Sequence, residues 1–135
     1  QVPEDSDAYE GIHDVLECLI DNGKTLAICS NREEENIKED VERVFPNIGF
    51  KYISGYRKGI PDKPDPYRLN EIVEKENISK EYAIFFGDKD VDILAAKNAG
   101  IDMVVVKWGQ GNENDYANPY PLRAIDFPKD ILDFI

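Results

Sequence analysis

Three carboxylates lie within five positions, directly after a run of apolar residues. In the stretch IFFGDKDVD, residues Asp88, Asp90 and Asp92 stand where a strand is expected to end and a helix to begin. One aspartate can cap a helix, and others gain about 0.3–1 kcal/mol each from the helix dipole. Two carboxylates about 4 Å apart, however, repel by about 4 kcal/mol at an effective dielectric constant of roughly 20. Capping therefore explains one aspartate well and all three poorly.

A divalent cation would turn this repulsion into attraction. Mg²⁺ prefers hard oxygen ligands and needs only one or two carboxylates, completed by water and phosphate oxygens. Asp88 and Asp92 are four positions apart at the expected strand-to-helix turn, so both could face one ion, whereas Asp90 would point into solvent. From the local sequence alone, a Mg²⁺ site and an ordinary helix start stay open as alternatives.

Two further residues suggest anion binding, and each has an ordinary alternative. Ser30 closes the apolar run TLAIC and is expected to open a helix, where its hydroxyl and the free N–H groups of the first turn form an anion site. The alternative is a serine that only caps the helix. Lys63 precedes two prolines in KPDP, which stiffen the loop that presents its side chain. The alternative is a solvated lysine beside a helix start.

The elements around these residues are expected to alternate between helix and strand. Helices are expected from residue 9 to Asn22-Gly23, from Ser30-Asn31 through Ile37, Val41 and Val44 to Pro46, and over residues 66–76, 93–100 and 128–135. Strands are expected over residues 25–29, 50–54, 82–86 and 103–108, followed by a brief stretch at 123–127. Apolar strands that alternate with helices predict an α/β fold, Rossmann-like, with a mostly parallel sheet and helices on both faces. Ligands of such sheets bind outside the carboxyl ends of the strands, which Ser30 and Asp88 follow.

The composition predicts a globular protein of one domain, with residues 1–8 as a polar lead-in and 9–135 as the domain. The chain has 135 residues, of which 41% are apolar and 33% charged. Its net charge of −12 argues against nucleic acid and against anionic membrane surfaces, but not against a small phosphorylated ligand whose charge is met by a metal or local cations. No apolar run approaches the ~20 residues that cross a bilayer, and Cys18 and Cys29 are expected to be buried free thiols. The sequence therefore predicts a cytoplasmic protein.

The order of these motifs resembles that of the haloacid dehalogenase-like hydrolase superfamily, most closely its phosphoglycolate phosphatase branch. Ser30, Lys63 and the Gly87-Asp88 to Asp92 segment match the second, third and fourth signature motifs. The stretches YEGIHDVLECLIDNGKTLAICSN, KPDP, FFGDKDVDILAAKNAG and VVVKWG extend the resemblance over nearly the whole chain. The resemblance implies a Mg²⁺-dependent phosphatase that acts on a small phosphorylated metabolite such as phosphoglycolate.

The resemblance also implies roles for individual residues. Ser30 and the backbone N–H of Asn31 would hold the transferring phosphoryl group, and Lys63 would neutralise its charge and steady the nucleophile. Asp88 would bind Mg²⁺, with Asp92 helping directly or through water. Phosphoryl transfer depends mainly on positioning and charge stabilisation, so these residues form a sensible set.

The nucleophile of the family is missing from this sequence. Its first motif, Asp-x-Asp-x-Thr at the end of the first strand, supplies the aspartate that forms a phospho-aspartyl intermediate and the general acid/base. Asp5-Ser6-Asp7 has the spacing but follows no apolar strand. The family's central first strand and cap domain are missing as well, which would leave the strands at 25–29 and 82–86 with unpaired edges. We therefore expect a carboxyl-terminal portion of a longer phosphatase, inactive alone, or one piece of an assembly in which a second chain or copy completes the sheet.

Two functions of other classes stay open. One is a non-catalytic regulatory module of the same fold that binds phosphate or Mg²⁺ without a nucleophile. The other is a phosphoacceptor receiver domain, although receivers place their acidic residues before the hydroxyl and the lysine, contrary to the order found here. His13, the only histidine, is expected on the outer flank of the first helix with no catalytic role.

Overall fold

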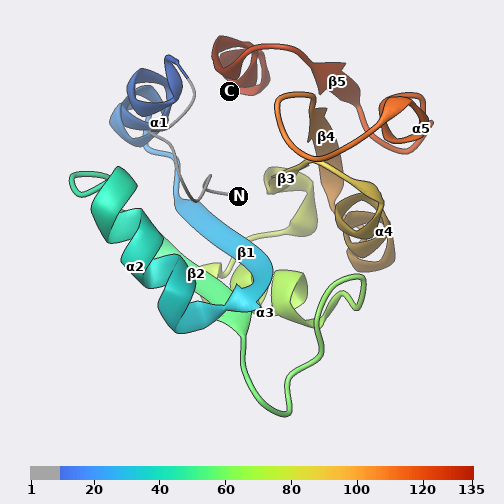
Figure 1. Ribbon diagram of the computed structural model, residues 1–135, viewed down its shortest axis with the longest axis horizontal. Helices are drawn as coiled ribbons and strands as arrows, with labels where there is room; N and C mark the ends of the chain where they lie inside the picture. The colour runs from blue at the N-terminus through green and yellow to red at the C-terminus, as the bar shows by residue number, and fades with distance from the viewer. Residues whose placement is uncertain (1–9) are drawn as a thin grey trace. The chain divides into compact units, whose positions relative to one another are not determined.

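The computed structural model describes residues 10–135, which form alternating helices and strands (Figure 1). The helices are α1 (Ile12–Asp21), α2 (Glu34–Val44), α3 (Tyr67–Glu76), α4 (Asp90–Ala99) and α5 (Glu113–Tyr116), with 3-10 helices at Lys80–Tyr82 and Pro128–Phe134. The strands are β1 (Leu26–Glu33), β2 (Phe50–Tyr56), β3 (Ile84–Gly87), β4 (Asp102–Val106) and β5 (Arg123–Ile125). All three strand pairings within this range are parallel, which confirms the predicted α/β class. The predicted lead-in, residues 1–8, lies outside the described residues.

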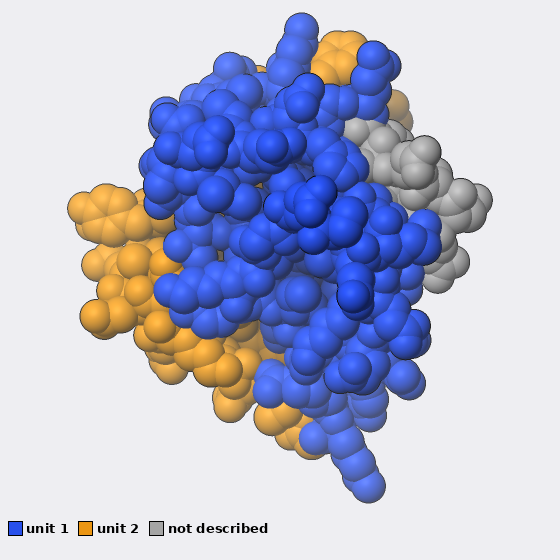
Figure 2. Space-filling view, turned by 90° about the vertical axis from the view of Figure 1, so that its left-hand side faces the viewer, with its two compact units in different colours: residues 1–58, 128–135 blue, residues 59–127 orange. Residues whose placement is uncertain are grey.

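The described residues divide into two compact units (Figure 2). The first unit comprises residues 10–58 and 128–135 and contains the sheet β1-β2 with α1, α2 and the last 3-10 helix. The second unit comprises residues 59–127 and contains the sheet β3-β4-β5 with α3, α4 and α5. The prediction that residues 9–135 form one domain stays a prediction.

The core of the first unit lies under one face of α2. Ile37, Val41 and Val44 recur at the helical spacing, are buried, and pack with Phe45 and Ile48. Leu26, Ile28, Phe50 and Ile53 of the two strands pack against this cluster. His13 of α1 is exposed, as predicted, and its Nε2 lies 2.9 Å from the carbonyl oxygen of Val44.

The core of the second unit is built on β4, the middle strand of its sheet. Met103, Val104 and Val105 are fully buried, because β3 and β5 pair with both edges and α4 packs on one face. Ala96 of α4 is equally buried; its small side chain lets the helix approach the strand closely. Since α4 directly follows β3 in the chain, this packing fixes the first turn of α4 at the carboxyl end of β3.

Several predicted boundaries shift in the structure. The helix predicted to start at 93 begins at Asp90, and the strand predicted over 82–86 begins only at Ile84, after the 3-10 turn. The short helix α5 was not among the expected elements, and the terminal helix is of the 3-10 type. Cys18 and Cys29 are free thiols, as predicted, but both are partly exposed and not buried. Among residues 10–135, no helix combines the length and the apolar character needed to cross a membrane.

Candidate functional site

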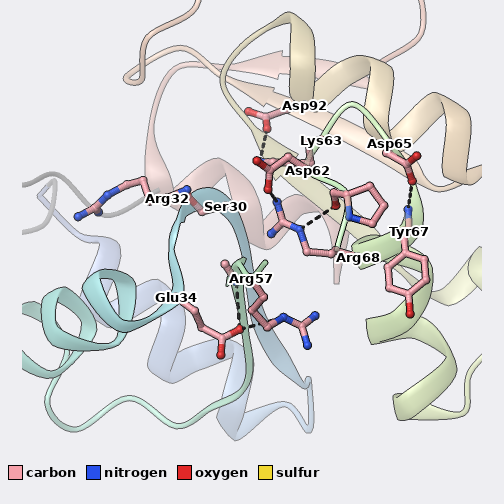
Figure 3. A network of polar contacts seen from close by, with 12 residues as sticks. Ser30, Arg32, Glu34, Arg57, Asp62, Lys63, Asp65, Tyr67, Arg68 and Asp92 are labelled. Carbon is pink, nitrogen blue, oxygen red and sulfur yellow. Dashed lines mark hydrogen bonds and ion pairs between the residues drawn. The ribbon is translucent and has the colours of Figure 1, made fainter. Parts of the chain in front are cut away.

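Three of the predicted site residues, Lys63, Asp88 and Asp92, come together in the second unit. Nζ of Lys63 lies 2.6 Å from Oδ1 of Asp92, and these side chains are only 8% and 7% exposed (Figure 3). The backbone N–H of Asp88 donates to the other oxygen of Asp92, Oδ2, at 3.0 Å. The buried ammonium of Lys63 and the two residues Asp88 and Asp92 therefore share one site beyond the carboxyl end of β3.

The strand-to-helix turn brings the two aspartates into contact. β3 ends at Gly87 and α4 begins at Asp90, so that Asp92 in the first turn of the helix reaches back to the end of the strand. Gly87 makes this approach possible, because a Cβ at that position would lie 2.6 Å from the Cβ of Asp92. A side chain at position 87 would therefore displace Asp92.

The loop that carries Lys63 is anchored by Arg68 of α3. This arginine is fully buried, and its Nη2 donates to Oδ1 of Asp62 at 3.0 Å (Figure 3). Its Nε also donates to the carbonyl oxygen of Pro61 at 3.3 Å. On the other side, Nζ of Lys63 lies 5.2 Å from the ring centroid of Phe85 in β3, a cation–π contact. Both interactions help to hold the ammonium at Asp92. Arg68 could not be recognised from the sequence, because an arginine in an amphipathic helix is normally exposed.

The two carboxyl groups have opposite electrostatic surroundings. Burial raises the pKa of Asp88 above its ordinary 3.8, and the nearby Asp92 raises it further, while the N–H of Gln110, 2.8 Å from Oδ2, only partly offsets this. Burial also opposes ionisation of Asp92, but the attraction and hydrogen bond of Lys63, with the bonds from Asp88, outweigh it and lower the pKa of Asp92. Lys63 therefore compensates the charge of Asp92, and the negative charge of Asp88 would gain most from an added cation.

The pair fits part of a Mg²⁺ site. Carboxylate oxygens are the hard ligands that Mg²⁺ prefers, and one or two suffice when water and phosphate oxygens complete the shell. Within the part of the chain that the structure describes, no group of three or more His, Cys, Asp or Glu side chains is arranged to hold a metal ion. Asp90 is exposed, as predicted, and its Oδ1 accepts the N–H of Val91 at 2.9 Å. Asp88 and Asp92 would thus form only one side of the ion's shell.

Ser30 and Asn31 lie in the first unit, within β1. This strand continues to Glu33 and α2 begins only at Glu34, so the prediction that Ser30 opens a helix is wrong. The extension arises because β1 resumes its pairing with β2 at Glu33 after an irregularity in the register, although the residues there are polar. The buried Ser30 accepts the N–H of Arg32 through Oγ at 3.2 Å. Its predicted role in phosphate binding, and that of Asn31, stay predictions.

The carboxyl ends of β1 and β2 are joined by polar contacts. Oε1 of Glu34 accepts the N–H of Gly55 at 3.3 Å and lies 3.6 Å from Nε of Arg57 (Figure 3). Arg32 pairs with Asp40 of α2 at 2.7 Å. These contacts fix the segment that follows Ser30 within the first unit.

Comparison with known proteins identifies the family. The haloacid dehalogenase-like hydrolase model matches residues 2–106, and the chain therefore belongs to the haloacid dehalogenase-like hydrolase family. Among curated relatives, phosphoglycolate phosphatase 1 of Pseudomonas aeruginosa is 30% identical over 127 residues, which are 94% of this chain and 47% of that protein. A phosphoglycolate phosphatase of Mesorhizobium japonicum is 32% identical over 108 residues, or 80% of this chain and 48% of that protein. The chain thus spans about half the length of the curated relatives it matches.

Solved structures show the same fold. A predicted phosphoglycolate phosphatase from Haemophilus somnus superposes with a TM-score of 0.89 at 24% identity, covering 98% of this chain and 59% of the other. A haloacid dehalogenase-like family hydrolase from Streptococcus pneumoniae superposes with a TM-score of 0.84 at 22% identity, covering 95% and 60%. At these identities the likeness concerns the fold, and it agrees with the α/β class predicted from the sequence.

Proposed function

We propose that this chain is the carboxyl-terminal portion of a Mg²⁺-dependent phosphomonoesterase that acts on a small phosphorylated metabolite such as phosphoglycolate. Membership of the hydrolase family and the two relatives named as phosphoglycolate phosphatases support this proposal. The observation that carries it is the buried Lys63–Asp92 ion pair beside Asp88. The complete protein is the polypeptide that contains this chain together with the proposed nucleophile strand.

Each residue of the site has a chemical task in this proposal. Lys63 stabilises the negative charge on the transferring phosphoryl group, because its ammonium is held in a buried position before the substrate arrives. Asp92 holds that ammonium with one oxygen and the backbone of Asp88 with the other. Asp88, with help from Asp92, would hold Mg²⁺, which when bound supplies positive charge to the phosphoryl oxygens. Ser30 and Asn31 are proposed to donate hydrogen bonds to the same phosphoryl group.

We further propose that the nucleophile lies on a strand that pairs with the second edge of β3. Among residues 10–135, the strand order β3-β4-β5 places β3 at one end of its sheet, where it pairs with β4. The outer edge of a strand at the end of a sheet is a site for further strand pairing. The missing strand would come from the longer polypeptide or from another chain, since a second copy of these 135 residues could complete the sheet but would bring no nucleophile. The 135-residue chain alone is accordingly expected to be inactive.

The test is turnover of the complete protein with phosphoglycolate and Mg²⁺. Asp88→Ala should lower kcat by about 10²–10³-fold, the usual cost of removing one electrostatic contributor to an active site. Asp90→Ala is the matched control, because Asp90 is two positions away but exposed, and it should leave turnover unchanged. Mg²⁺-dependent turnover that survives Asp88→Ala would remove the proposed role of Asp88.

A non-catalytic module that binds phosphate or Mg²⁺ is the second candidate. It is favoured by the lack of an Asp-x-Asp-x-Thr motif behind an apolar strand in these 135 residues. The coding sequence upstream of Gln1 distinguishes the two, because a hydrophobic strand that ends in this motif would support the phosphatase. The cytoplasmic location and the lack of nucleic-acid or membrane partners stay predictions from charge and composition.

A further inference from the structure

The loop between β4 and α5 lies directly against Asp88. The backbone N–H of Gln110 donates to Oδ2 of Asp88 at 2.8 Å. A Cβ at Gly109 would overlap the side chain of Asp88, and one at Gly111 would overlap its carbonyl oxygen. Two glycines that flank the donor therefore let the main chain approach the carboxylate, and they also leave the loop with few restraints of its own.

Tyr116 restrains this loop at both ends. Its hydroxyl lies 3.0 Å from the carbonyl oxygen of Gly111 and 3.4 Å from that of Lys107, so its proton can be donated to either. The ammonium of Lys107 also lies 5.6 Å from the centre of the Tyr116 ring. The hydroxyl therefore connects the two ends of the segment that contains Gln110.

A reciprocal capping arrangement places Tyr116 at this position. Oδ1 of Asn112 accepts the N–H groups of Asn114 and Asp115 at 3.0 and 3.2 Å. In return, Oδ2 of Asp115 accepts the N–H of Asn112 at 3.0 Å. This capping box fixes the single turn of α5 at whose end Tyr116 stands.

We infer that Tyr116 is a positioning residue for the metal site: its hydroxyl holds the loop 107–111, and the loop holds the carboxylate of Asp88 through the N–H of Gln110. The inference rests on the proposed function, since it assigns Asp88 to Mg²⁺. Groups that orient a metal ligand through a hydrogen bond typically contribute 10–100-fold to metal affinity. Tyr116 acts one step further away, through the loop, so the lower end of this range applies.

Tyr120 offers a matched control in the same unit. Its hydroxyl lies 2.7 Å from the carbonyl oxygen of Ile101 and 3.4 Å from that of Ala96, so it also bridges two main-chain carbonyls. These carbonyls stand at the carboxyl end of α4, whereas Asp88 precedes its amino end. Tyr120→Phe thus removes an equivalent hydroxyl without touching the loop at Asp88.

The experiment is a Mg²⁺ titration of three proteins: the complete protein, its Tyr116→Phe variant and its Tyr120→Phe variant. At each Mg²⁺ concentration the thermal unfolding midpoint and the turnover are measured. Mg²⁺ that binds the folded protein raises its midpoint by mass action. Tyr116→Phe should raise the apparent Mg²⁺ dissociation constant about tenfold in both measurements, which means weaker binding. Tyr120→Phe should leave that constant unchanged, even where it lowers the midpoint without Mg²⁺.

The other outcomes separate failure of the inference from failure of the proposed function. If the unmodified protein responds to Mg²⁺ and Tyr116→Phe responds equally well, Tyr116 has no positioning role, although Asp88 keeps its assignment. Equal weakening in both tyrosine variants would also overturn the inference, because the effect would then be general. If neither the unfolding midpoint nor the turnover of the complete protein depends on Mg²⁺, the proposed metal site and this inference are both wrong.

Discussion

Replacing Lys63 by methionine removes the charge of the buried ion pair while keeping a side chain of similar length. The carboxylate of Asp92, 7% exposed, would then be left with the N–H of Asp88. Removing one partner of a buried pair costs about 3–5 kcal/mol, because the remaining charge stays buried without compensation. Since Asp92 keeps one hydrogen bond, we expect the lower end, about 3 kcal/mol near neutral pH.

The pH dependence of this cost follows from the two pKa values of Asp92. In the unmodified protein the folded-state pKa of Asp92 lies below its ordinary 3.8, so its stabilisation is present above 3.8 and is lost as the pH falls through the lowered value. In Lys63→Met, burial dominates and raises the pKa, so protonation relieves the buried charge. The difference in stability between the two proteins should therefore be largest near neutral pH and shrink as the pH falls toward 3.8.

Urea unfolding followed by tryptophan fluorescence measures this difference. Trp108 is the only tryptophan of the chain and lies in the second unit with Lys63. Lys97→Met is the matched control, because Lys97 is an exposed lysine on α4 of the same unit. A Lys63→Met midpoint equal to that of Lys97→Met, or a difference that does not change with pH, would refute the role assigned to the ion pair.

Two further predictions concern the same turn. Asp88→Asn should raise the urea midpoint of the metal-free protein at pH 7, because the raised pKa of Asp88 means that its ionised form destabilises the folded state as the pH rises above 3.8. This gain in the urea midpoint should vanish below pH 3.8. A midpoint of Asp88→Asn at pH 7 that is equal to or lower than that of the unmodified protein would contradict the prediction. Gly87→Ala should cost about 1–3 kcal/mol of stability and reduce turnover, because the new Cβ would displace Asp92. Gly49→Ala, where a Cβ meets no atom within 4 Å, is its control, and equal effects of the two would contradict the packing argument.

The strand-to-helix turn could be predicted from sequence because its signals are local. An apolar run, a glycine and two aspartates four positions apart predicted that Asp88 and Asp92 could face one ion. The structure brings the two residues together, with the backbone N–H of Asp88 3.0 Å from Oδ2 of Asp92, and the shared ion stays a prediction. The end of β1 could not be predicted in this way. The apolar run stops at Cys29, but main-chain pairing with β2 resumes at Glu33, and main-chain pairing does not depend on apolar side chains.

The contacts that support the site could not be predicted from local sequence patterns. Arg68 is buried only because the preceding loop folds back to place Asp62 and the carbonyl oxygen of Pro61 beside it. The segment around Gln110 has no apolar period and indicates only a loop, yet it reaches Asp88, 22 positions earlier in the chain. The pair of glycines directly after a strand was the one available signal, since it indicates a close approach of the main chain.

The most direct measurement is a crystal structure of the complete protein grown with Mn²⁺ in place of Mg²⁺ and with a phosphate analogue, using the anomalous signal of the metal. The proposal predicts one strong peak within about 2.2 Å of an oxygen of Asp88, a distance expected for such an ion and a carboxylate. Lys63 and Asp92 should still be paired beside it, and the phosphate analogue should lie against the ammonium. A metal bound elsewhere, with Asp88 outside its shell, would contradict the central claim.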